Sequence, residues 1–158
     1  MIKRENAYFE ELKRIGHEYE EARVERQERK KQIIDTLGWD SEELKAWYAE
    51  DAAATYPISQ GACKAYRAFM SSISRQEDEV EMDDFLWERD VKEFVEAFKA
   101  AGITGFVYTN QSTAVMENLH QLTAAGCTMQ GLCTITRQES RWGDEEPYEV
   151  MGIRFTLN

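Results

Sequence analysis

Thiols and imidazoles are the side chains that most often carry chemistry near neutral pH, and this chain holds few of them. It contains Cys63, Cys127 and Cys133, and its histidines are His17 and His120. A catalytic cysteine needs a nearby histidine to stabilise its thiolate, and neither Cys127 nor Cys133 has such a partner in the sequence. The C-x-x-C, H-E-x-x-H and His-x-x-x-His spacings of metal sites are also missing. We therefore expect no catalytic residue, no metal and no cofactor, and we interpret the thiols as reduced, buried side chains.

The turn TNQST, which joins a predicted strand to a predicted helix, is the best candidate for a small-ligand site. Free N–H groups at the start of a helix, together with hydroxyl groups, suit an anion. The turn lacks the glycines of phosphate-binding loops, so helix capping by Ser112 or Asn110 is the favoured interpretation. The alternative is a small enzyme or ligand-binding domain whose site contains Thr109, Asn110, Ser112 and Thr113, with His120 or a nearby carboxylate as the acid or base.

An acidic run in the middle of the chain offers a surface for a protein partner. Residues 77–84 include Glu77, Asp78, Glu79, Glu81, Asp83 and Asp84. Such a run is typical of a solvated loop or an edge strand, and the sharper hypothesis is a patch that meets the lysines and arginines of a partner. The charged loop with Trp142, Asp144 and Glu145 is a second candidate for partner contact, since exposed tryptophan often anchors interfaces. The alternative is that Trp142 packs back onto the sheet.

A long amphipathic helix is predicted at the start of the chain. Its apolar residues repeat at spacings of four and three and are Tyr8, Leu12, Ile15, Tyr19 and Ala22. The helix should end before Gly38, and Ser41 and Ser59 are predicted to cap two further helices. An apolar stripe needs a partner, so a homodimer through residues 8–22 is one hypothesis.

The C-terminal part is predicted to alternate between helices and strands. A helix over residues 87–101, a strand over 103–108 and a helix ending at Gly126 precede strands over 127–137 and 148–157. The helix before Gly126 is expected to bury Val115, Met116, Leu119 and Leu122. If the strands 103–108 and 127–137 are adjacent and parallel, their crossover should be right-handed. The last two strands should form an antiparallel hairpin.

Alternation along these strands assigns their core faces. We expect Cys127, Met129, Gly131, Cys133 and Ile135 to face the core, together with Met151, Ile153, Phe155 and Leu157. Residues 79–85 can add a strand. The predicted fold class is α+β: a long N-terminal helix and a helical segment, then a small mixed sheet of three to four strands with helices on one face. We divide it into a helical region, 1–76, and a sheet region, 77–158, which together form one compact domain with a helical extension.

The overall charge excludes some classes of partner. The chain of 158 residues carries a formal net charge of −11, and residues 39–102, with seven basic and fifteen acidic residues, hold −8 of it. A surface of this sign repels phosphate backbones, so we expect no direct binding to DNA or RNA. No apolar run is long enough to span a bilayer and no signal peptide is recognised, which predicts a soluble, cytoplasmic protein with no membrane partner.

The C-terminal stretch carries a resemblance. The segments GFVYTNQSTAVMENLHQLTAAGC, GLCTITR and RWGDEEPYEVMGIRF resemble a family of small uncharacterised bacterial proteins carried on conjugative and phage-like elements. This resemblance includes no catalytic motif, so no residue role follows from it. It implies a context, namely accessory cargo of mobile DNA.

Our first hypothesis is a non-enzymatic protein that binds a basic host protein through its acidic surface. An anti-CRISPR-like inhibitor of a CRISPR effector, or of another nucleic-acid-binding protein, is its concrete form. Association of this kind should weaken steeply with salt. The site at residues 109–113 and the helical dimer are the alternatives.

Overall fold

The computed structural model describes residues 2–137 and 146–158, and its internal contacts divide the chain into two compact units. One unit comprises residues 1–9 and 59–158, and the other comprises residues 10–58. The predicted partner-binding residues Trp142, Asp144 and Glu145 lie outside the described residues. Within the described part of the chain, no helix is long and apolar enough to cross a membrane.

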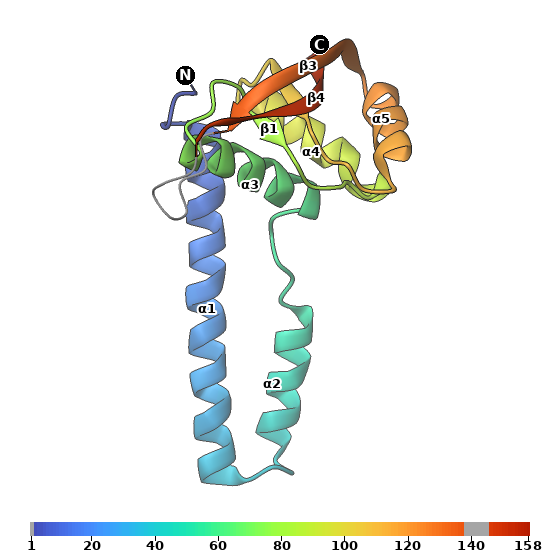
Figure 1. Ribbon diagram of the computed structural model, residues 1–158. Helices are drawn as coiled ribbons and strands as arrows, with labels where there is room; N and C mark the ends of the chain where they lie inside the picture. The colour runs from blue at the N-terminus through green and yellow to red at the C-terminus, as the bar shows by residue number, and fades with distance from the viewer. Residues whose placement is uncertain (1, 138–145) are drawn as a thin grey trace. The chain divides into compact units, whose positions relative to one another are not determined.

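The unit of residues 10–58 is an antiparallel pair of helices, formed by α1 (Ala7–Leu37) and α2 (Glu42–Ala53) (Figure 1). Gly38, with a φ of 82°, ends α1 as predicted, and the Ser41 hydroxyl accepts from the backbone N–H of Leu44 at 3.2 Å. The buried Trp47 indole donates to the Arg26 carbonyl at 2.7 Å. Trp47 is therefore the buried aromatic anchor between α2 and α1, and the ion pairs of Arg26 with Asp51 and of Arg29 with Glu50 also join the two helices.

The other unit contains a mixed four-stranded sheet, in agreement with the predicted α+β class. Its strands are β1 (Glu81–Met82), β2 (Gly105–Tyr108), β3 (Cys127–Arg137) and β4 (Tyr148–Leu157), in the spatial order β1-β2-β4-β3. β1 is parallel to β2, whereas β4 is antiparallel to both β2 and β3. The parallel contact considered between residues 103–108 and 127–137 is absent from this sheet, because β4 lies between β2 and β3.

Three helices complete this unit: α3 (Gln60–Ser74), α4 (Glu88–Ala100) and α5 (Val115–Ala124). Phe94 and Phe98 of α4 contact Phe106 of β2 at ring-centroid distances of 5.7 and 5.5 Å, and Phe106 stacks on Phe155 of β4 at 5.4 Å. The core therefore lies between α4 and the sheet, and α3 packs beside α4 (Figure 1). The predicted Ser59 cap is confirmed, since its hydroxyl accepts from the Ala62 N–H at 3.1 Å.

The structure corrects several predicted core positions. A bulge shifts the β3 register between Met129 and Gly131, and Cys127 is the one residue of the predicted β3 face that is fully buried. On β4, Phe155 is buried but Met151 is 68% exposed. The reason is that β2 pairs with β4 only over residues 153–156, so the β3–β4 hairpin continues past the core. On α5, Met116 is 77% exposed.

Candidate binding site on the acidic segment

The acidic segment, defined as residues 77–84, leaves the end of α3 through a strained residue. Arg75 caps α3, and Gln76 adopts a φ of 56°, the left-handed region that non-glycine residues seldom occupy. This turn reverses the chain so that Glu77 and Glu81 point inward. The parallel pairing of β1 with β2 then fixes the position of Glu81 beside Val107.

Glu81 lies at the centre of a buried ionic cluster, with no exposed surface. Two nitrogen atoms of the Arg137 guanidinium donate to its carboxylate, the Thr109 hydroxyl donates at 2.5 Å, and Arg75 Nη1 lies 3.3 Å away. Burial opposes ionisation, but the contacts with Arg137, Glu77 and Thr109 and the charge of Arg75 outweigh it and lower the pKa of Glu81. Glu81 is therefore a satisfied structural anion.

Glu77 is also buried, but the described residues give it none of the hydrogen bonds that Glu81 accepts. It is 4% exposed, and neither carboxylate oxygen accepts a hydrogen bond from the described residues. Arg75 Nε makes an ion pair with it at 3.4 Å, longer than a hydrogen bond of this type. Burial, followed by the neighbouring Glu81 carboxylate, raises the pKa of Glu77 to about 8. The Glu77 carboxyl group is thus poised to gain or lose a proton near neutral pH.

Glu77 borders a cavity of about 210 Å³, which we call the acidic slot. The slot is lined by Gln76, Glu77, Asp78, Glu79, Thr134, Ile135 and Thr136. Its carboxylates come from the acidic segment and its hydroxyl groups from β3. Glu77 and Asp78 also border a second cavity, of about 710 Å³, together with Lys3 and Arg4, neither of which forms an ion pair among the described residues. The acidic slot offers anionic and hydroxyl acceptors to a cation.

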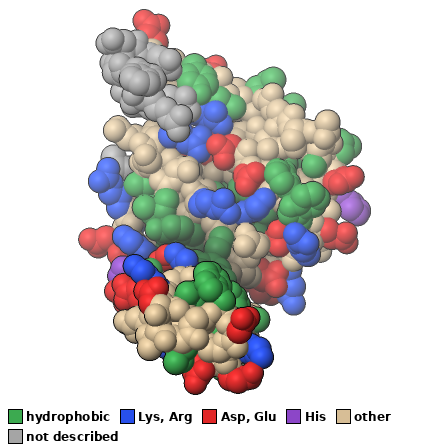
Figure 2. Space-filling view, turned by 90° about the horizontal axis from the view of Figure 1, so that it is seen from below, with side chains coloured by type: hydrophobic (Ala, Val, Ile, Leu, Met, Phe, Trp, Pro, Cys, Tyr) green, Lys and Arg blue, Asp and Glu red, His purple; other side chains and the backbone are tan. Residues whose placement is uncertain are grey.

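The rest of the acidic segment is largely neutralised by cations of the same chain. Glu79 pairs with Arg154 at 2.6 Å, Asp83 with Arg75 at 3.1 Å and Asp84 with Lys64 at 3.3 Å. On the face shown in Figure 2, acidic and basic side chains are interspersed rather than separated into a single acidic field. The six predicted contact residues therefore divide into two buried carboxyl groups, Glu77 and Glu81, and four at the surface, Asp78, Glu79, Asp83 and Asp84.

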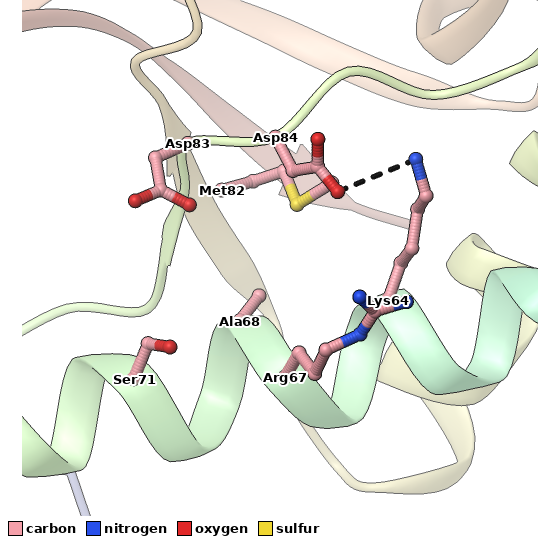
Figure 3. A pocket seen from close by; sticks show the side chains of 7 residues that line it. All are labelled: Lys64, Arg67, Ala68, Ser71, Met82, Asp83 and Asp84. Carbon is pink, nitrogen blue, oxygen red and sulfur yellow. Dashed lines mark ion pairs between the residues drawn. The ribbon is translucent and has the colours of Figure 1, made fainter.

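A polar pocket of about 320 Å³ lies between α3 and the end of the acidic segment. It is lined by Lys64, Arg67, Ala68, Ser71, Met82, Asp83 and Asp84 (Figure 3). Lys64 is nearly buried, donates to the Phe85 carbonyl and lies 4.1 Å from the centre of the Phe85 ring. The pocket thus has two cations on one wall and two carboxylates on the other.

The predicted ligand turn at residues 109–113 uses its polar groups internally. Thr109 donates to Glu81, and the Asn110 amide donates to the Asp83 carbonyl at 2.9 Å. Asn110 Oδ1 accepts from the Ser112 N–H at 3.0 Å, and the Ser112 hydroxyl accepts from the Ala114 N–H at 3.3 Å. Neither Asn110 nor Ser112 caps α5, whose N-cap is Ala114. Thr113 and His120 are exposed, and the role proposed for this turn stays a prediction.

Cys127 is the buried thiol of β3. Burial raises the pKa of Cys127 to about 11, which disfavours a nucleophilic thiolate. Among the described residues, no three His, Cys, Asp or Glu side chains gather as metal ligands would.

Within the unit of residues 10–58, Tyr19 packs edge-on against Tyr56 at 5.1 Å. Dimerisation through residues 8–22 stays a prediction.

Sequence reasoning missed the cations that organise this site. Arg137 and Arg154 reach the acidic segment from β3 and β4, at sequence separations of 56 and 75 residues. No local pattern marks either residue. The one available signal is their position on otherwise uncharged stretches of strand, where a buried or half-buried arginine needs an anion.

A family model described as a domain of unknown function, DUF7698, matches residues 64–157. The match therefore includes most of α3, the acidic slot and the polar pocket, and it excludes the helical pair of residues 10–58. No curated protein and no solved structure gives a significant match to the chain.

Proposed function

The chain belongs to the DUF7698 family of domains of unknown function, and we propose that it is a non-enzymatic binding protein. Its proposed partner is a protein with a basic surface, one arginine or lysine of which enters the acidic slot. The partner cation donates to Glu77, while Asp78 and Glu79 at the slot contribute further negative charge.

The observation that supports this proposal is that the buried Glu77 carboxylate accepts no hydrogen bond from the described residues and has only the 3.4 Å ion pair with Arg75 among them. A buried acceptor without a hydrogen bond costs free energy, which a charged donor from outside would recover. The neighbouring anions are already paired: Glu81 with Arg137, and Glu79 with Arg154. Glu77 is thus the acidic group with most to gain from a partner, and a cation that enters a slot of about 210 Å³ can be a side chain but not a folded element.

A peptide titration tests this function directly. The probe is a short capped peptide of alternating glycine and arginine, followed by NMR chemical shifts of the protein. Glu77→Gln removes the acceptor charge and should weaken binding roughly tenfold or more, since a hydrogen bond to a charged group contributes about 1.5–3 kcal/mol. Raising salt from about 50 to 300 mM should also weaken binding.

Two controls make the result decisive. The same peptide with citrulline in place of arginine keeps its shape but loses its charge, and it should not bind. Glu117→Gln changes an exposed acid of α5 that does not line the slot, and it should leave affinity unchanged. Equal affinity of the Glu77→Gln variant, equal affinity for the citrulline peptide, or no binding of the arginine peptide at low salt would each overturn the proposal.

The specific form of this proposal is an anti-CRISPR-like inhibitor carried by a bacterial mobile element. Its supports are the resemblance of the C-terminal stretch and the net charge of −11, which suits the cationic channel of a nucleic-acid-binding effector. Gel filtration with a candidate CRISPR effector at two salt concentrations tests it. A complex that forms at low salt and is lost in Glu77→Gln supports it, whereas association indifferent to ionic strength contradicts it.

A further inference from the structure

The polar pocket of α3 contains a cation, Arg67, that has no partner in the described part of the chain. Arg67 is exposed and forms no ion pair or hydrogen bond with the residues that the structure describes, although two carboxylates line the same pocket. Each of those carboxylates already has a partner: Asp84 pairs with Lys64, and Asp83 pairs with Arg75. Among the described residues, the guanidinium of Arg67 is therefore the charged group of this pocket without a partner, and its planar donors match a carboxylate.

The opposite wall restricts which anion can bind. Asp83 and Asp84 face the pocket from the segment after β1, opposite Lys64 and Arg67 on α3 (Figure 3). A phosphate dianion would be repelled by these carboxylates. A ligand that carries a positive group beside its carboxylate instead meets a complementary charge on each wall. The side-chain surface of Asp84 is 45% exposed, so its carboxylate remains accessible while Lys64 holds it.

From this arrangement we propose that the polar pocket binds a free α-amino acid as a zwitterion. The ligand carboxylate accepts from Arg67, with the Ser71 hydroxyl as a further donor, and the ligand ammonium donates to Asp84 and Asp83. Ala68 and the buried Met82 form the apolar lining. A volume of about 320 Å³ is at the lower end of ligand pockets, which favours a molecule of this small size.

This site is separate from the acidic slot, because the two share no lining residue. The pocket is held in place by the rest of the domain: Lys64 is fixed to the Phe85 carbonyl, and Asn110 holds the Asp83 carbonyl. A ligand there would bridge α3 to the acidic segment and stabilise their contact.

Ligand-detected NMR with the full-length protein and the proteinogenic L-amino acids at millimolar concentration tests this site. The best ligand is then compared with its N-acetyl form, which lacks the ammonium, its amide, which lacks the carboxylate, and inorganic phosphate. We expect the free amino acid to bind and each blocked form to lose about tenfold or more in affinity, as expected when a charged hydrogen bond is removed. Phosphate should not compete.

Arg67→Gln should lose binding to a similar extent without loss of stability, since Arg67 is exposed and has no partner among residues 2–137 and 146–158. Arg89→Gln is the matched control, because Arg89 is an exposed arginine of α4 outside the pocket. Glu77→Gln should also retain amino-acid binding. The test of this pocket is therefore independent of whether a partner binds at the acidic slot. No signal from any amino acid, equal binding of the N-acetyl form or of phosphate, or full affinity in Arg67→Gln would each overturn the inference.

Discussion

The side chain of Asn118 makes both hydrogen bonds of the Leu86 backbone: its amide donates to the Leu86 carbonyl at 2.7 Å, and its oxygen accepts from the Leu86 N–H at 2.9 Å. The same oxygen accepts from the Tyr108 hydroxyl at 2.8 Å. Asn118 is 1% exposed. One asparagine therefore joins α5, β2 and the segment that leads into α4.

Replacing Asn118 with alanine should destabilise the domain by about 2–4 kcal/mol, because two buried backbone groups and a hydroxyl lose their partner. Asn118→Asp keeps the acceptor but cannot donate to the Leu86 carbonyl, so it should also destabilise. The measurement is urea unfolding followed by circular dichroism. Glu117→Ala, at an exposed neighbouring position, is the control and should change stability little; an equal loss in both variants would contradict the role of Asn118.

Asn118 also shows where reasoning from sequence succeeds and fails. The bounds of β3 and β4 and the caps at Ser41 and Ser59 were predictable, because alternation and capping are local patterns. The burial of Asn118 in place of Met116 depends on Leu86, which is 32 residues away in sequence. The inward direction of Glu81 likewise depends on Arg137, which is 56 residues away in sequence, so an acidic run that reads as a solvated face is partly interior.

Stability should fall as pH rises through the neutral range. The pKa of Glu77 is raised from its ordinary value of 4.5 to about 8, so between these values the folded state holds a proton that the unfolded chain releases. Folding stability then decreases with pH across that window, by a few kcal/mol at most, and levels off above it. The lowered pKa of Glu81 acts only at acidic pH, where its protonation would cost stability.

Urea unfolding at several pH values measures this slope. Glu77→Gln should remove most of it and should be more stable than the parent protein above about pH 8, since it buries no charge there. Glu79→Gln is the matched control, because Glu79 is half exposed and paired with Arg154. A slope that persists unchanged in Glu77→Gln would show that another group titrates.

Binding of a cationic peptide at the acidic slot should release protons. At neutral pH the raised pKa keeps the Glu77 carboxyl group largely protonated, and a cation favours its ionised form. The affinity should therefore rise with pH up to about 8 and then level off. Calorimetry in two buffers of different ionisation enthalpy counts the protons; identical heats in both buffers would contradict the linkage.

The helical pair of residues 10–58 should depend on Trp47. Its indole is 3% exposed and donates to Arg26, so Trp47→Ala should loosen α2 from α1 at a cost of about 3–5 kcal/mol. Hydrogen exchange of the α2 amides measures the loss locally. Trp39→Ala, at a 70% exposed position, is the control and should leave exchange unchanged.

The close packing of α3 against α4 should require glycine at position 61. A Cβ atom there would lie 2.3 Å from the Asp90 carbonyl oxygen and 2.7 Å from the Phe94 nitrogen, which are backbone atoms of the facing helix. Gly61→Ala should therefore force the helices apart and destabilise the domain by at least about 1–3 kcal/mol, despite the better helix propensity of alanine. Gln60→Ala, at an exposed neighbouring position, gains the same propensity without the clash and should keep or raise the thermal midpoint. Because α3 carries Lys64 and Arg67, Gly61→Ala should also weaken the binding of any ligand to the polar pocket. A Gly61→Ala protein as stable as the parent would show that α3 and α4 do not approach this closely.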